Sequence, residues 1–148
     1  MSAITAPKLK QFARRLLAYE VGPTQPADVK DSAAFRVCEK LRGPLGKLMG
    51  IGGFRSLFSR ALVLATAEIP WLAALQIKAD GSLEGFQEAK VKLDWSATAE
   101  GESVLVAQLL GLLMTFVGAG LTVRLLHDIW PKLDDLNFEE EKHYAEKK

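Results

Sequence analysis

Sulfur and imidazole groups are scarce in this chain, which has one cysteine and two histidines among its 148 residues. Because Cys38 has no second cysteine to pair with, an intramolecular disulfide is excluded, and we expect a reducing, cytoplasmic location. The simplest role for Cys38 is that of a small, buried apolar side chain. No cysteine or histidine pair has the spacing of metal ligands, so the sequence predicts neither a metal nor another cofactor.

Motifs for catalysis and phosphate binding are lacking as well. The chain has no G-x-S-x-G sequence, the pattern that presents a nucleophilic serine. Gly46-Lys47 is followed by Leu48 instead of the Ser or Thr of a phosphate loop, and Arg55 replaces the third glycine of a dinucleotide loop. We therefore expect a protein that is not an enzyme. Gly52-Gly53 precede a predicted helix with Arg55 and Ser56 in its first turn, so a small-molecule or anion-binding sensor is one alternative.

Charge is unevenly distributed along the chain. Residues 1–60 contain 11 lysines and arginines against 4 acids, a net of +7, whereas residues 61–148 contain 8 against 14, a net of −6. One interpretation is that the two parts fold together and largely neutralise each other. The alternative is a nucleic-acid-binding or anion-binding face in the first part. Its candidate residues are Arg36, Lys40, Arg42, Lys47, Arg55 and Arg60.

Apolar residues recur at helical spacing over residues 8–19, 28–42 and 54–67. The first of these segments indicates an amphipathic helix and not a secretory signal. We expect Gly43-Pro44 to interrupt the second helix. Asp80-Gly81 predicts a β-hairpin or irregular insert within residues 76–95, with a short helix over 84–90 as the alternative. Residues 1–136 are expected to form one helical domain, followed by a charged, mobile tail over 137–148.

The longest charge-free stretch separates Glu102 from Arg124 and contains 21 residues. Its length suits a helix that spans a membrane once. However, the other predicted helices each need an apolar partner, and Glu100 and Glu102 flank one end where a membrane protein carries basic or aromatic residues. We therefore interpret residues 101–129 as the central helix of a bundle, with a single-span membrane protein as an alternative.

Small and weakly polar residues follow one side of this predicted helix, at alternating steps of three and four. Such a seam allows another backbone to approach closely, either within the chain or in a second copy. It predicts an interface, and the protein is expected to bind itself as a homo-oligomer or to bind another protein. The seam residues are Gln108, Gly111, Thr115, Gly118 and Thr122.

The fold predicted from these patterns is mostly α: a single-domain bundle of four to five helices around the 101–129 helix, with the small insert at 76–95. The predicted role is that of a non-enzymatic protein–protein interaction or assembly subunit. A nucleic-acid-binding protein, a membrane protein and a sensor are the alternatives.

Overall fold

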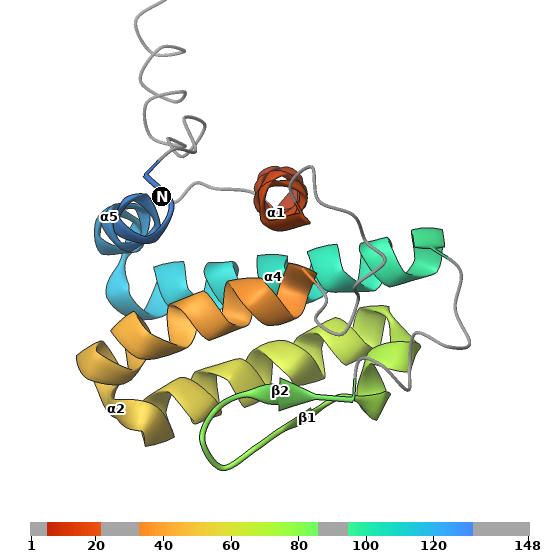
Figure 1. The fold of residues 1–148 in the computed structure, drawn as a ribbon, viewed down its shortest axis with the longest axis horizontal. Helices are drawn as coiled ribbons and strands as arrows, with labels where there is room; N and C mark the ends of the chain where they lie inside the picture. The colour runs from red at the N-terminus through yellow and green to blue at the C-terminus, as the bar shows by residue number, and fades with distance from the viewer. Residues whose placement is uncertain (1–5, 22–32, 86–94, 132–148) are drawn as a thin grey trace, which may run out of the picture.

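The computed structural model describes residues 6–21, 33–85 and 95–131 of the chain. It confirms a mostly α bundle with one small antiparallel hairpin (Figure 1). The predicted tail at 137–148 lies outside the described residues. The elements, in chain order, are helix α1 (Ala6–Val21), helix α2 (Ala33–Glu68), 3-10 helix η1 (Pro70–Ala74), strands β1 (Gln76–Ile77) and β2 (Leu83–Glu84), and helices α4 (Trp95–Val117) and α5 (Ala119–Ile129).

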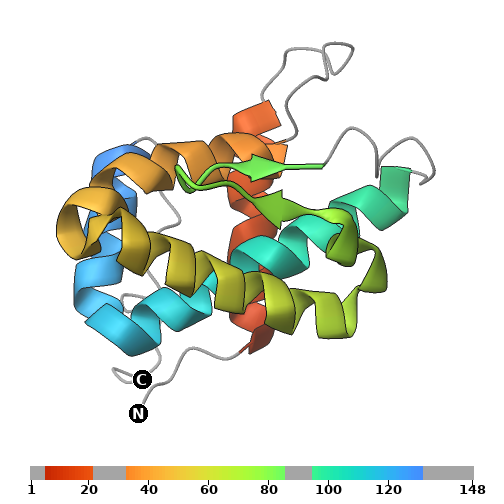
Figure 2. The ribbon, with the colours of Figure 1, turned by 90° about the horizontal axis from the view of Figure 1, so that it is seen from below.

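Helix α2 folds back on itself as two arms, residues 33–49 and 51–68 (Figures 1 and 2). The prediction that Gly43-Pro44 would interrupt it is wrong, because Pro44 lies inside the first arm. The reversal falls at Gly50, whose φ of 81° and ψ of 156° lie outside the helical region. Glycine lacks a Cβ and adopts a positive φ readily. Proline removes one helical hydrogen bond and crowds the preceding turn, but here the helix continues past Pro44.

Helix α4 is the central element, as the charge-free stretch predicted. It packs against α1, α2 and α5, and α1 and α5 lie on one side of it with the second arm of α2 on the other (Figures 1 and 2). Its large apolar side chains are completely buried at four positions, namely Leu105, Leu109, Leu110 and Leu113.

The helix predicted over 101–129 is divided in two, which is a second departure from expectation. Gly118 has φ 95° and ψ 151°, a combination that only glycine adopts easily. Helix α4 therefore ends at Val117, and α5 sets off in another direction from Ala119. The seam residues before and after Gly118 consequently do not lie along a single helix.

The predicted hairpin is present over residues 76–84, with Gln76 opposite Glu84 and Ile77 opposite Leu83. Its turn holds Asp80-Gly81, and Gly81 has a φ of 89° that suits glycine. The tip packs against α2 near its reversal, since a Cβ at Gly81 would lie 3.1 Å from the Cδ1 atom of Ile51. The alternative helix over 84–90 lies almost wholly outside the described residues.

Two helices of the described part are long and apolar enough to cross a bilayer, judged by length and composition only: α2 and residues 96–117. Gly50 breaks the first of them, and half of the most apolar window of the second is buried in the bundle. The core helix of a bundle passes the same test, so these two helices indicate a membrane protein only weakly.

Candidate functional site

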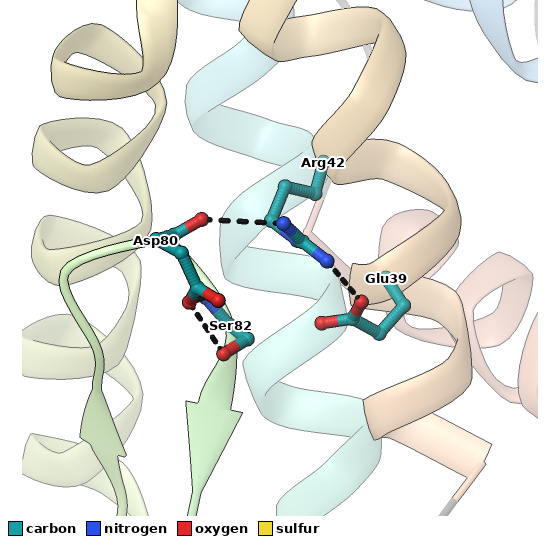
Figure 3. A network of polar contacts seen from close by, with 4 residues as sticks. All are labelled: Glu39, Arg42, Asp80 and Ser82. Carbon is teal, nitrogen blue, oxygen red and sulfur yellow. Dashed lines mark hydrogen bonds and ion pairs between the residues drawn. The ribbon is translucent and has the colours of Figure 1, made fainter.

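The hairpin is fastened to α2 by a polar network around Arg42 (Figure 3). One terminal guanidinium nitrogen of Arg42 lies 2.5 Å from Oε1 of Glu39, and the other donates to the backbone oxygen of Asp80 over 3.4 Å. The Asp80 carboxylate accepts from the backbone N–H and the hydroxyl of Ser82, over 2.9 and 2.6 Å. These two hydrogen bonds from Ser82 lower the pKa of Asp80, and the nearby Arg42 and Lys78 charges add to the effect.

A second polar cluster joins α1, the first arm of α2 and the end of α5, which are far apart in the sequence. Trp130, at the end of α5, is 1% exposed, and its indole N–H donates to Oε2 of Glu20 over 2.6 Å. The same Glu20 oxygen lies 2.6 Å from Nζ of Lys40, and the Glu20 backbone oxygen accepts from Arg36 over 2.9 Å. Nζ of Lys40 also lies 5.9 Å from the centre of the Trp130 ring. We call Glu20, Arg36 and Lys40 the cradle of Trp130.

The Glu20 side chain in this cradle is only 5% exposed. A carboxylate that leaves water needs charged or hydrogen-bonding partners, and Lys40 and Trp130 provide them. Sequence reasoning missed this cluster, although one signal was present. Glu20 follows Leu16 by four residues and Leu17 by three, so it continues the apolar side of α1 into the core.

The predicted basic face is divided among separate structural contacts. Arg36 and Lys40 belong to the cradle, and Arg42 belongs to the hairpin network. Nε of Arg55 donates to the backbone oxygen of Lys78 over 3.2 Å and so also holds the hairpin. Lys47 and Arg60 are exposed on different arms of α2. Four of these six side chains are therefore engaged within the chain.

The predicted anion site at Gly52-Gly53 lies in the first turn of the second arm of α2 and does not precede it. Both glycines are exposed, and they follow the reversal at Gly50 by two and three residues. Their backbone N–H groups belong to helical geometry that begins at Ile51. The sensor hypothesis stays a prediction.

The structure separates the seam residues into buried and exposed groups. A Cβ on Gly111 would lie 3.3 Å from Cδ1 of Leu9, so its close neighbour is α1 of the same chain. Thr122 is completely buried and donates its hydroxyl to the Gly118 oxygen over 2.8 Å. Thr115 is exposed and donates to the Gly111 oxygen over 3.1 Å, while Gln108 is half-buried. Thr115 and Gly118 are the seam residues left exposed at the surface.

Two large apolar side chains lie beside these exposed seam residues. Phe116, in the last turn of α4, is 66% exposed, and Leu121, in the first turn of α5, is 38% exposed. Thr115, Phe116, Gly118 and Leu121 are all exposed and uncharged, and they lie within three residues of the break between α4 and α5; we call these four residues the junction patch. Single exposed apolar side chains are common on protein surfaces, whereas several that adjoin one another mark a surface that contacts another molecule.

Cys38 is buried, as expected from the sequence. Burial raises the pKa of its thiol, and the nearby carboxylates of Glu39 and Glu102 raise it further. The nucleophilic form of cysteine is the thiolate, which this environment disfavours strongly. Cys38 is therefore part of the core and not a candidate nucleophile.

Within residues 6–21, 33–85 and 95–131, no three side chains of His, Cys, Asp or Glu come together in a group suited to a metal ion. Comparisons with family models, with curated proteins and with solved structures found no match to this chain.

Proposed function

We propose that this protein is a non-enzymatic interaction subunit that associates with a second copy of itself through the junction patch. The observation that carries the proposal is that Phe116 is 66% exposed, whereas Phe12, Phe54 and Phe58 are buried in the core. Covering one large aromatic side chain on association contributes about 1.5–3 kcal/mol. Thr115 and Gly118 beside it have little bulk and allow a close approach.

The charge pattern supports an apolar contact at this surface. The junction patch lies in the charge-free stretch between Glu102 and Arg124, so its association does not depend on ion pairs. Salt screens ion pairs between exposed groups but does not weaken apolar contacts. Association through the junction patch is therefore expected to persist at high salt, whereas head-to-tail pairing of the two oppositely charged parts of the chain is not.

The test is the solution mass by light scattering, measured over a range of protein concentrations at low and high salt. Phe116→Ser should weaken self-association by about tenfold or more, as expected for an aromatic residue at the centre of an interface. Val63→Ser is the matched control, because Val63 is 68% exposed but lies on the second arm of α2, on the other side of α4 from α5. A wild-type protein that stays monomeric at every concentration, or equal effects of the two substitutions, would refute the proposal.

A further inference from the structure

Helix α5 is connected to α4 through a single residue, Gly118. The Gly118 N–H donates to the Met114 oxygen over 2.9 Å, and the Gly118 oxygen accepts from the Thr122 N–H over 3.1 Å. Between these two bonds the backbone changes direction at Gly118. The first N–H groups of α5, which starts at Ala119, therefore have no carbonyl of a preceding helical turn to donate to. Gly118 has no side chain to cap them. A continuous helix through Gly118 would make those hydrogen bonds.

The far end of α5 is held by groups that do not belong to α4. Trp130 inserts into the cradle, where Glu20 comes from α1 and Lys40 and Arg36 come from the first arm of α2. A second copy of the chain presents an identical cradle, so it would accept the same tryptophan with the same partners. The partner that fits this site is therefore defined by the chain's own sequence.

We propose that two copies exchange α5. In the exchanged dimer the backbone straightens at Gly118, α5 continues the direction of α4, and Trp130 donates its indole N–H to Glu20 of the partner subunit. Short connections between packed elements favour exchange over closure within one chain. The proposal deepens the proposed function, on which it rests, because it names how the second copy is held: the cradle of each copy receives α5 and Trp130 of the other.

The first experiment identifies which copy supplies the tryptophan. Two samples of the full-length protein, one labelled with ¹⁵N and the other with ¹³C, are unfolded together and refolded at high concentration. Exchange predicts a nuclear Overhauser effect from the ¹⁵N-bound indole proton of Trp130 to the side-chain protons of Glu20 in ¹³C-labelled copies. A dimer whose Trp130 contacts only the Glu20 of its own copy overturns the exchange and leaves the proposed function intact.

The second experiment changes the connection itself. Gly118→Ala disfavours the positive φ of the closed form but suits a continuous helix. It should therefore shift the equilibrium from the closed form to the continuous form by about tenfold per connection. Since each dimer releases two connections, the association constant should rise about a hundredfold. Gly120→Ala is the matched control, because Gly120 lies inside α5, has no positive φ and has nothing within 4 Å of an added Cβ. It should leave the association constant within about twofold.

Lengthening the connection should have the opposite effect, and it does not depend on whether Gly118→Ala folds well. Insertion of Gly-Ser-Gly after Gly118 gives α5 more freedom to pack against its own chain. The protein should therefore shift toward monomer. An insertion variant that dimerises as strongly as the wild type overturns the exchange. A wild-type chain and variants that are all monomeric at every concentration overturn both the exchange and the proposed function.

Discussion

The replacement of Gly101 by alanine should destabilise the bundle, although alanine is the better helix former. Gly101 lies in the first half of α4, under the indole ring of Trp71. A Cβ at this position would lie 2.7 Å from Cε2 and 2.9 Å from Nε1 of Trp71, and closer still to Cζ2. The ring is held there because its N–H donates to the backbone oxygen of Ala97 over 3.2 Å, one helical turn before Gly101.

The magnitude follows from two opposing effects. Within a helix, alanine is more favourable than glycine by about 0.5–1 kcal/mol. Against this, forcing a methyl group into a filled space costs about 1–3 kcal/mol, and displacing the ring breaks the bond to Ala97, which costs about 0.5–1.5 kcal/mol more. We expect Gly101→Ala to lower the free energy of unfolding by about 2 kcal/mol, which corresponds to a Tm lower by about 4–8 °C for a chain of this length.

Urea denaturation followed by circular dichroism measures this change. Gly43→Ala and Gly120→Ala serve as controls, since both glycines are helical and an added Cβ meets nothing within 4 Å at either position. Both should raise the free energy of unfolding by about 0.5–1 kcal/mol. In a Trp71→Leu background, Gly101→Ala should become stabilising as well. If Gly101→Ala in the otherwise wild-type chain stabilises as much as the controls do, the indole ring does not rest on α4 and the reasoning fails.

Three further predictions concern the polar clusters and the thiol. Trp130→Phe leaves the Glu20 carboxylate without its indole donor and should reduce the free energy of unfolding by about 1–3 kcal/mol in urea titrations. Because the pKa of Asp80 is lowered, its contribution to stability is present above the ordinary aspartate pKa and is lost as pH falls through the lowered value. Ser82→Ala should raise the pKa of Asp80 in an NMR titration, and an unchanged value would contradict the hydrogen bonds of Figure 3. Cys38 should react with iodoacetamide at pH 8 much more slowly in the folded protein than in urea, because burial disfavours its thiolate.

The core of this fold could be predicted because periodicity is a local property of the sequence. Leu9, Phe12 and Leu16 recur at helical spacing in α1, and all three are buried. The hairpin could be predicted for a similar reason, since Asp80-Gly81 fits a tight turn whatever surrounds it. Patterns of this kind depend on neighbours a few residues away, and those neighbours are visible in the sequence.

The reversal of α2 shows where such reasoning ends. Residues 43–53 contain five glycines and one proline, and any of them is compatible with a break. The helix passes through Gly43-Pro44 and reverses at Gly50, where the second arm returns to place Phe54 and Phe58 in the core. The penalties of a proline and of several glycines within a helix differ by only a few kcal/mol. Tertiary packing therefore determines where the helix breaks, and this packing cannot be read from a single sequence.

The Trp130 cradle could not be predicted because its members are far apart in the chain. Glu20 and Trp130 are separated by 110 residues, and their hydrogen bond depends on how α1 and α5 cross the bundle. Only the burial of Glu20 could be inferred from the sequence, because Glu20 lies on the apolar side of α1. The same limit applies to the basic residues: their number was evident, but their internal partners were not.

The break at Gly118 differs from the break at Gly50 in what lies on either side. The second arm of α2 returns to bury Phe54 and Phe58, so the reversal at Gly50 is fixed by the core of its own chain. At Gly118 the turn leaves Phe116 and Leu121 exposed, while Thr122, Leu126 and Trp130 are buried against the rest of the chain. The sequence pattern predicts a continuous helix, and the structure departs from it at one glycine. In the proposed exchange, the continuous helix and the broken one are two arrangements of the same contacts, and the concentration of the protein would decide between them because only the continuous one requires a partner.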